Sequence, residues 1–513
     1  MDIKSIETQT PEQLIDIIET QEREIEWLKE QLRLMMNQQF GRKKETAPQP
    51  GQTSLFEDWQ EALDSLELEE DIVQEVKAHK RKAKKNKGIK RAILDQFPAE
   101  EKLHELSNCQ CPDCGESMKQ IGASAVREEL VFIPAHMKRI IHKQASYKCE
   151  GCTQKEGAND KIVKAPVPKA PLNNSLGSAS LIAQTIHQKY GLKLPAYRQE
   201  QEWKQMNLPL SRDTICGWHI RTYQYYFQNL CDLLLNKLRQ QEVLHADETS
   251  YRVLESQKAK NYFWLLMSGK DTPEQGIIYQ FDEGRGRQVI LDLLGPDFEG
   301  SLHADMYGAY VNLCKEKVKV SGCWAHLRRK FFEALPAKVS KHHPAYQAVK
   351  WCDSFFQFEQ NWKELTTEER LTWRQTCLQR QVDEFFDWVK TLNALPQTKL
   401  GMAISYALKH EPFFRQFLEN GRLEMSNNRA ERQIKPLVIG RKNWLFSQSI
   451  QGAQAAGGIL SLYESAKLNG IHPPSYFQYL LEELPELPVQ NFEALEAYLP
   501  WSSKVKEACQ AMK

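Results

Sequence analysis

Long apolar runs are missing from this 513-residue sequence, and so is a dense set of cysteines. No stretch reaches the ~18 consecutive apolar residues of a transmembrane helix, which excludes a membrane-spanning protein. The first residues, MDIKSIETQTPEQ, contain no apolar core behind a basic start, so we expect no secretory signal. Twelve cysteines are too few for a disulfide scaffold of this length, and a reducing cytoplasm is the expected compartment.

Net charge is also nearly absent, because 68 basic and 67 acidic residues leave a total of +1. The charges are nevertheless separated: residues 57–75 contain nine acids and no base, and residues 77–91 contain nine Lys or Arg and no acid. The basic run predicts either a solvated flexible arm or an arm that contacts DNA phosphates. The candidate phosphate contacts in this arm are Lys80, Arg81, Lys82, Lys84 and Lys85.

The length predicts about three domains at ~150 residues each. Near the N-terminus, residues 11–37 place apolar side chains at alternating steps of three and four. This pattern predicts a short coiled coil that pairs two protomers, and the alternative is an amphipathic helix packed on its own domain. Residues 180–222 have the pattern of successive short helices, for which a DNA-binding helix-turn-helix and plain helical packing are equally good interpretations.

Two C-x2-C pairs are the strongest metal signal in the sequence. Cys111 and Cys114 are followed, after 34 intervening residues, by Cys149 and Cys152. Each pair can direct two thiolates at one ion, and two pairs complete the tetrahedral shell of a structural Zn²⁺ site. The residues between the pairs alternate between apolar and polar, as paired strands do. We therefore predict a zinc ribbon.

Two short apolar runs end in the same tripeptide, His-Ala-Asp. The run VLHAD ends at Asp247 and the run SLHAD ends at Asp305. The runs NYFWLLMSG, GIIYQFD and VKVSGCWAH also have the pattern of strands, and helical segments alternate with these runs, which predicts an α/β unit. Because strand ends lie side by side in a sheet, the two carboxylates can converge on a hard cation such as Mg²⁺.

A third acid lies in a basic segment, SNNRAERQIKPLVIGRKNW, at residues 426–444. Asn427 or Asn428 can cap a helix here, which puts Glu431 in the first turn. Glu431 either faces a metal while the surrounding bases face phosphate, or it pairs on the surface with Lys435 at the i, i+4 spacing.

Taken together, these motifs resemble those of the insertion-sequence-66-type DDE transposases. The matching stretches include CPDCG with CEGC, VLHADETSYRVL, LHADMYGAY, CWAHLRRKFFEAL and NNRAERQIKPLVIGRKNWLF, in the family's order. The resemblance implies a multidomain α/β protein with an N-terminal coiled coil, a zinc ribbon and an RNase H-like catalytic core that carries an all-helical insertion. The expected domains are a coiled-coil helix (1–45), a charged linker with the basic arm (46–95), a four-cysteine zinc domain (96–165), a helical DNA-binding region (166–240), the catalytic core (241–450, insertion 333–420) and a C-terminal helical tail (451–513).

The resemblance also implies a function. Asp247, Asp305 and Glu431 would hold two Mg²⁺ or Mn²⁺ ions, for cleavage at the element's terminal inverted repeats and for attack of the freed 3′-hydroxyl on target DNA. Further candidate phosphate contacts are His326, Arg328, Arg329, Arg432 and Lys435. His326 is alternatively a packed residue at a helix start.

Several partners are expected besides DNA. A homo-oligomer, at least a dimer, follows from the predicted coiled coil, and accessory proteins of the same element are candidates. Residues 52–56, QTSLF, resemble the peptide by which bacterial proteins dock on the replicative sliding clamp. No membrane partner is expected, and the cytoplasm, at the nucleoid when DNA is bound, is the expected location. The alternatives are a domesticated DNA-binding protein without catalysis and an RNase H-like nuclease that cuts without joining.

Overall fold

The computed structural model describes residues 137–148, 162–315, 317–336, 338–488 and 491–511. The chain divides into two units, residues 70–167 and the rest of the chain. Several predicted features lie outside the described residues: the coiled coil of residues 11–37, the peptide 52–56, the basic-arm residues Lys80, Arg81, Lys82, Lys84 and Lys85, and the zinc cysteines Cys111, Cys114, Cys149 and Cys152.

In the unit formed by residues 70–167, two short strands make an antiparallel hairpin. Strand β1 (Ser146–Lys148) pairs with β2 (Ile162–Lys164), and Tyr147 lies opposite Val163. The Gln144 side-chain amide donates to the Ala165 carbonyl at 2.7 Å and extends the pairing. β1 lies within the segment predicted to form paired strands, whereas its partner follows the second cysteine pair.

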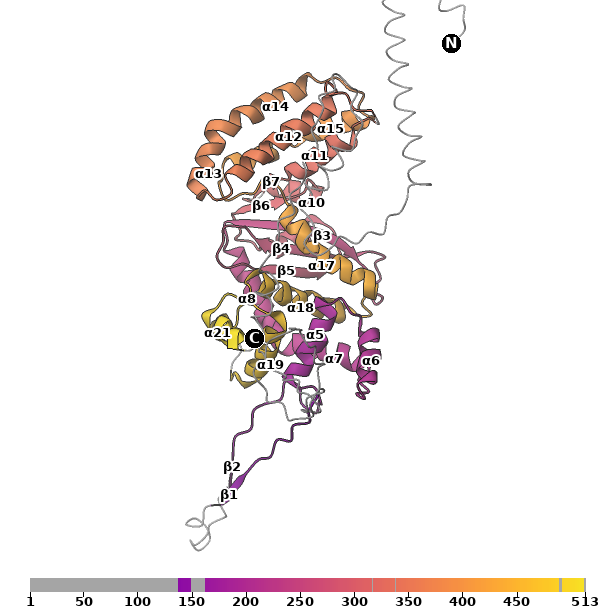
Figure 1. The fold of residues 1–513 in the computed structure, drawn as a ribbon, viewed down its shortest axis with the longest axis vertical. Coiled ribbons are helices and arrows are strands. Elements are labelled where there is room, and N and C mark those ends of the chain that lie inside the picture. Colours follow the sequence, from indigo (N-terminus) through magenta and orange to yellow (C-terminus); the bar gives the residue numbers. More distant parts are fainter. Residues whose placement is uncertain (1–136, 149–161, 316, 337, 489–490, 512–513) are drawn as a thin grey trace, which may run out of the picture. The chain divides into compact units, whose positions relative to one another are not determined.

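A five-stranded mixed sheet forms the centre of the other unit, in the order β5-β4-β3-β6-β7 (Figure 1). The strands are β3 (Val243–Tyr251), β4 (Asn261–Ser268), β5 (Ile277–Asp282), β6 (Ser301–Ala304) and β7 (Lys319–Gly322). The first three form an antiparallel meander, and β6 and β7 run parallel to β3. All five occur where the sequence predicts strands.

β3 differs from its prediction in one respect that affects the site. The sequence predicts a strand that ends at Asp247, but β3 continues to Tyr251 because its second half pairs with β4. Its parallel pairing with β6 stops at His245, opposite His303. Asp247 therefore lies where β3 separates from β6, while β4 still holds its backbone in register.

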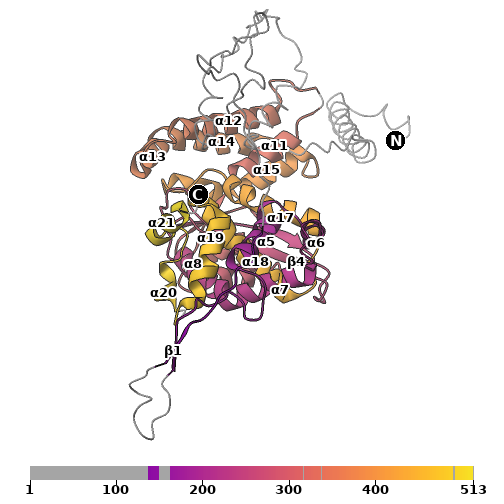
Figure 2. The same ribbon diagram turned by 60° about the horizontal axis from the view of Figure 1, so that its bottom comes forward.

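Helices from both ends of this unit pack around the sheet and share one hydrophobic core with it (Figures 1 and 2). α18 (Ile450–Leu468) packs against β5 and is buried along most of its length. The other helices of this core are α5 (Ala179–Ile186), α6 (Ala196–Gln205), α7 (Arg212–Thr222), α8 (Gln228–Arg239), α9 (Arg287–Leu294), α10 (Gly308–Val311), α17 (Asn428–Trp444), α19 (Pro473–Glu483), α20 (Phe492–Glu496) and α21 (Ser503–Ala511).

The helices of residues 180–222 are built into this core. Ser211 caps α7, since its hydroxyl accepts the Thr214 N–H at 3.2 Å. Ile215 and Trp218 of α7 are buried, and α7 contacts both α5 and α18. Packing accounts for these apolar faces, and DNA binding by this segment stays a prediction.

An all-helical insertion separates β7 from α17 and has its own hydrophobic core. Its helices are α11 (Trp324–Glu333), α12 (Pro344–Asn361), α13 (Thr367–Trp373), α14 (Gln379–Thr391), α15 (Lys399–Lys409) and α16 (Glu411–Arg415). Trp324 lies at the centre, where its indole N–H donates to the Phe414 carbonyl at 2.8 Å and its ring contacts Phe355 and Phe385. Among the described residues, no helix has both the length and the apolar character needed to cross a membrane.

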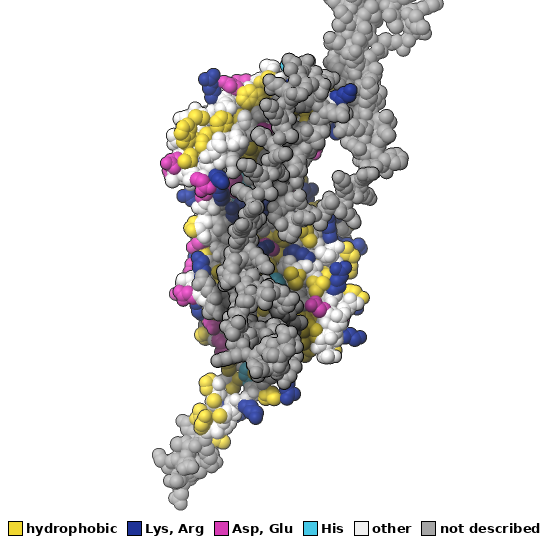
Figure 3. Space-filling view, viewed as in Figure 1, with side chains coloured by type: hydrophobic (Ala, Val, Ile, Leu, Met, Phe, Trp, Pro, Cys, Tyr) yellow, Lys and Arg dark blue, Asp and Glu magenta, His cyan; other side chains and the backbone are white. Residues whose placement is uncertain are grey.

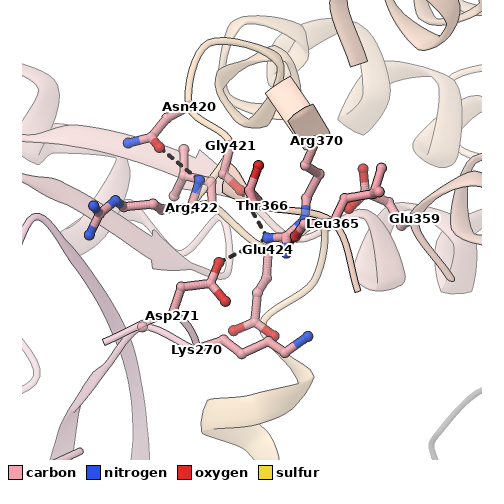
Figure 4. A network of polar contacts seen from close by, with 12 residues as sticks. Lys270, Asp271, Glu359, Leu365, Thr366, Arg370, Asn420, Gly421, Arg422 and Glu424 are labelled. Atoms are coloured by element: carbon pink, nitrogen blue, oxygen red, sulfur yellow. Dashed lines mark hydrogen bonds and ion pairs between the residues drawn. The ribbon is translucent and has the colours of Figure 1, made fainter. Parts of the chain in front are cut away.

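Two buried arginines connect the insertion to the segment that leads into α17. Arg370 of α13 pairs with Asp271 at 2.9 Å and donates to the Gly421 carbonyl at 3.1 Å (Figure 4). Arg374, in the π-helical turn Arg374–Leu378, pairs with Glu359 at 2.6 Å. Its guanidinium also donates to three backbone carbonyls, those of Phe417, Asn420 and Leu423.

Candidate active site

The two His-Ala-Asp motifs lie side by side in the sheet. In the parallel pair of β3 and β6, His245 is the register partner of His303. Asp247 and Asp305 each follow two residues later, so the two carboxylates lie at the same edge of the sheet. The Asp305 carboxylate accepts the Tyr307 N–H at 3.0 Å, which orients it in the turn after β6.

Among the acids of the site, Asp247 has the most strongly shifted pKa. Its pKa is raised well above the usual carboxyl value, first because the side chain is buried and then because Glu248, Glu431 and Asp305 are negative neighbours. The Glu248 N–H donates to the Asp247 carboxylate at 2.8 Å and opposes this shift only in part. Among the described residues, the charged side chains that act most strongly on Asp247 are therefore negative.

Glu248 is a fourth acid at this site, which the sequence analysis did not single out although it follows Asp247 directly. Its side chain is 3% exposed and accepts from the Arg285 guanidinium at 2.6 Å and from the Tyr310 hydroxyl at 2.5 Å. Burial raises the pKa of Glu248, and the two donors oppose that effect. Unlike Asp247, this carboxylate has its own cation partner.

Glu431 reaches the cluster from the first turn of α17. Its carboxylate Oε1 lies 3.7 Å from His326 Nδ1, and its charge contributes to the raised pKa of Asp247. The alternative of a surface pair with Lys435 is not found, because no ion pair between these two side chains occurs in the described part of the chain.

Asn427 fixes the start of α17 on the sheet. It is the residue before the helix, but its side chain makes no capping hydrogen bond. Instead, its amide donates to the Ala246 carbonyl at 2.8 Å and its Oδ1 lies 3.0 Å from His245 Nδ1. Its backbone N–H donates to Cys323 Sγ at 3.1 Å. The predicted cap residue is therefore a clamp that places Glu431 beside the two aspartates.

The two histidines of the His-Ala-Asp motifs are buried in the sheet, each two residues before an aspartate of the site. His245 and His303 are fully buried and their rings stack at 5.1 Å, with 6° between the planes. His245 Nε2 lies 3.0 Å from Glu424 Oε2. Burial, with the neighbouring His245, lowers the pKa of His303 to about 3, so this ring is neutral near pH 7.

The candidate phosphate contacts separate into two groups. Arg432 and Lys435 are exposed on α17, beside Glu431. Arg328 is only 3% exposed and pairs with Asp353 at 2.6 Å, so it holds the insertion together and does not face solvent. Arg329 is half-buried next to it on α11.

His326 belongs to the acidic site and not to the exposed surface. It lies on the first turn of α11, which begins at Trp324, whereas the run VKVSGCWAH predicts a strand that continues to His326. Burial and the neighbouring Arg329 lower its pKa, while Glu431 and Asp305 oppose the shift. His326 is therefore a partly buried residue at a helix start, and its ring lies next to the Glu431 carboxylate.

The donor set fits divalent cations. Asp247, Asp305 and Glu431 offer carboxylate oxygens, the ligands that Mg²⁺ and Mn²⁺ prefer. Burial, and then the neighbouring carboxylates, raise the pKa of Asp247, and a cation between these oxygens would stabilise the ionised carboxylates. The four zinc cysteines lie outside the described residues.

A mixed sheet with carboxylates gathered at one edge, beside a helix with exposed Arg and Lys side chains, has the chemistry that divalent cations and phosphate groups require of a binding site. The particular family follows from comparison with known proteins. Residues 174–455 match the model described as "Transposase IS66 family", which covers more than half of the chain, and the chain belongs to that family. Further matches are a zinc-finger binding domain of transposase IS66 (108–153), "Transposase C of IS166 homeodomain" (27–101) and an IS66 C-terminal element (461–501).

Similar curated proteins come from Sinorhizobium fredii. The uncharacterized protein y4qI is 29% identical over 423 residues, which cover 79% of this chain and 76% of that protein. The uncharacterized protein y4jD is 27% identical over 435 residues, or 81% of this chain and 82% of that protein. These relatives extend the similarity along most of the chain, and their names assign no activity.

Proposed function

We propose that this chain is a DDE-type transposase that cleaves DNA at the ends of an insertion sequence and transfers the freed strand to target DNA. The observation that carries the proposal is the convergence of Asp247 and Asp305 with Glu431, from β3, from the turn after β6 and from α17. Membership of the transposase family supports the substrate class. The strand order β5-β4-β3-β6-β7, antiparallel and then parallel, supports an RNase H-like core.

In this proposal Asp247, Asp305 and Glu431 are the metal ligands. Bound Mg²⁺ or Mn²⁺ ions supply activation of the attacking oxygen and stabilisation of the leaving oxygen at a phosphodiester. The protein's own part is to hold the three carboxylates in place: Asn427 clamps the start of α17, and β4 holds the backbone of Asp247.

DNA is the proposed partner, and its backbone would meet exposed basic side chains. Arg432 and Lys435 project from α17, the helix that also carries Glu431. Lys and Arg side chains are visible along the edge of the molecule on which α17 lies (Figures 1 and 3). Lys80, Arg81, Lys82, Lys84 and Lys85 would add contacts from the basic arm, each of which releases counterions.

The N-terminal part has two further proposed roles. A structural Zn²⁺ ion bound by Cys111, Cys114, Cys149 and Cys152 is supported by the match to the family's zinc-finger domain. Pairing of two protomers through residues 11–37 would bring two active sites to the two ends of one element. The sliding clamp, through residues 52–56, and accessory proteins stay proposed partners.

The decisive experiment uses Asp305→Ala in a Mg²⁺-dependent cleavage assay on DNA that carries the element's terminal repeats. We expect strand cleavage to disappear while specific binding to the ends persists, because Asp305 holds metal and not DNA. Asp292→Ala is the matched control, since this aspartate is exposed on α9 and its carboxylate accepts from Gln288 of the same helix at 2.7 Å. Equal cleavage by the wild type and Asp305→Ala would overturn the assignment.

The same assay separates the two alternatives. A wild-type chain that binds the ends but never cleaves them is a domesticated DNA-binding protein. A chain that cleaves but gives no joined products with target DNA is a nuclease of the same fold. The close approach of the three acids favours cleavage over silent binding, because crowding carboxylates without a metal function only costs stability.

A further inference from the structure

Three side chains of different chemistry meet on one side of the acidic cluster. The Cys323 sulfur, a ring nitrogen of His326 and a carboxylate oxygen of Glu431 all lie within 4.8 Å of one another. Cys323 is the last residue before α11 and is fully buried, and His326 lies one turn further on. The C-x-x-H spacing at the helix start therefore directs both side chains at α17, which supplies Glu431.

Two atoms in this group lack partners. His326 Nδ1 and Glu431 Oε1 are both buried, and neither has a hydrogen-bond partner among the described residues. They lie 3.7 Å apart, which is too long for a hydrogen bond between them. Buried polar atoms without partners are rare because each one costs desolvation energy, and in native proteins they call for an explanation such as a bound ion.

The spacing suits a small cation with tetrahedral coordination. Metal–nitrogen and metal–oxygen bonds of about 2.0–2.1 Å place two such ligands about 3.3 Å apart, which is near the observed 3.7 Å. One thiolate, one imidazole and one carboxylate are ligands that Zn²⁺ accepts, whereas Mg²⁺ takes neither thiolate nor, commonly, imidazole. Three protein ligands would leave a fourth position open.

Backbone N–H groups surround the Cys323 sulfur and donate hydrogen bonds to it. The Asn427 N–H donates to Cys323 Sγ at 3.1 Å, and the backbone N–H groups of Ala325 and His326 also point at it. Such donors stabilise a thiolate once it is bound to metal. Without a cation, burial raises the pKa of Cys323 to about 12, and a coordinated divalent ion is the charge that deprotonates such a thiol.

We propose that Cys323, His326 and Glu431 form a second metal site that binds Zn²⁺ or a similar borderline-soft divalent cation. The site is separate from the four-cysteine zinc domain. Its consequence rests on the proposed function: because Glu431 belongs to both sites, Zn²⁺ held here withdraws that carboxylate from the Mg²⁺ ligands and inhibits cleavage.

The first test counts metal and does not depend on activity. The full-length wild type, Cys323→Ser and Cys352→Ser are equilibrated with excess Zn²⁺, freed of unbound metal and analysed for zinc per chain. We expect Cys323→Ser to hold one zinc fewer than the wild type. Cys352→Ser, which removes another fully buried thiol but lies in α12, is expected to match the wild type. Equal zinc content in all three proteins would overturn the site.

A second variant covers the case in which Cys323→Ser does not fold. His326→Asn keeps a polar side chain at the helix start and removes the nitrogen ligand, so it is also expected to lose one zinc. With Co²⁺ in place of Zn²⁺, the thiolate charge-transfer band of the wild type should exceed that of His326→Asn or Cys323→Ser. Identical spectra would count against the sulfur as a ligand, because the four-cysteine contribution cancels in the comparison.

The inhibitory consequence has its own measurement. Cleavage in Mg²⁺ is followed with increasing Zn²⁺, and each protein is compared with its own zinc-free rate. Losing one ligand should raise the half-inhibitory Zn²⁺ concentration at least about tenfold. If the zinc count supports the site while zinc leaves wild-type cleavage unaffected, the shared role of Glu431 is wrong. If no protein cleaves DNA at all, the proposed function fails and the zinc count still decides the metal site.

Discussion

Buried charge is treated in opposite ways at the sheet edge and in the helical insertion. In the insertion, Arg328, Arg370 and Arg374 are each paired with a carboxylate at 2.6–2.9 Å. At the sheet edge, carboxylates are gathered so that the pKa of Asp247 is raised by burial and by its acidic neighbours. The paired arginines of the insertion stabilise its structure, whereas the gathered carboxylates at the sheet edge have the charge that a bound cation would neutralise. Variants at Asp247, Arg374 and Asn427, and the pH dependence of stability, test this difference.

The largest expected effect is on activity. Asp247→Asn should reduce Mg²⁺-dependent cleavage by a factor on the order of 10³ or more, because a metal ligand is lost at the centre of the site. The same change should leave the metal-free protein as stable as the wild type or more stable, since it removes a buried charge that its neighbours oppose. Cleavage rates and urea unfolding, with Asp292→Asn as the control, measure both. A clear loss of stability in Asp247→Asn would break the comparison.

The reverse pattern is expected in the insertion. Arg374→Met should destabilise the protein by about 3–5 kcal/mol, because Glu359 is left buried without its cation. The carbonyls of Phe417, Asn420 and Leu423 would lose their donor as well. Arg380→Met is the matched control: this arginine is 85% exposed and pairs with Glu384 at i, i+4, a contact that contributes about 0.3–0.5 kcal/mol. Equal unfolding midpoints for the two variants would contradict the structural role of Arg374.

Asn427 lies between the two regions and should affect both readouts moderately. Asn427→Ala removes its contacts with Ala246 and His245, at a cost of about 1–3 kcal/mol. Because the clamp positions Glu431, the affinity for Mn²⁺ should also fall, by about 10- to 100-fold. Asn443→Ala, an exposed change on the same helix, should alter neither property. A variant that loses stability but keeps its Mn²⁺ affinity would reduce Asn427 to a purely structural residue.

The smallest effect concerns pH. The pKa of Asp247 is higher in the folded protein than in the unfolded chain, so its ionisation opposes folding. This contribution is absent below the unfolded pKa of about 4 and grows as the pH rises toward the folded value. Unfolding free energies of the metal-free wild type should therefore decline with pH relative to those of Asp247→Asn. Mg²⁺ should remove most of that difference, and parallel pH curves without metal would contradict the predicted crowding.

The sequence predicts the strands and the acids well, because both depend on local pattern. Five apolar runs bounded by turns become β3 to β7, and the repeated His-Ala-Asp motif marks two carboxylates whose strands turn out to be parallel neighbours. The predicted end of β3 was wrong by four residues, since pairing with β4 overrides the polar composition after Asp247.

Other features could not be predicted because they depend on contacts across long sequence separations. Arg328 lies in a basic sequence segment typical of a phosphate contact. In the structure, however, it is buried in the insertion and pairs with Asp353 on the neighbouring helix. Asn427 has the position of a helix cap, but its side chain finds Ala246 and His245 on β3. The adjacency of Cys323 to Glu431 likewise requires the insertion to bring α17 back to the end of β7.

The long insertion also sets the order in which the acidic site can form during synthesis. Asp247 and Asp305 are 58 residues apart, and Glu431 follows 126 residues after Asp305. Contacts of such high sequence separation form late, because loop closure must precede the gain from packing. A nascent chain can build the sheet and then the insertion, but it lacks the third acid and its Asn427 clamp until α17 has left the ribosome. The cluster thus assembles only after most of the polypeptide has been translated, so incomplete chains cannot complete it.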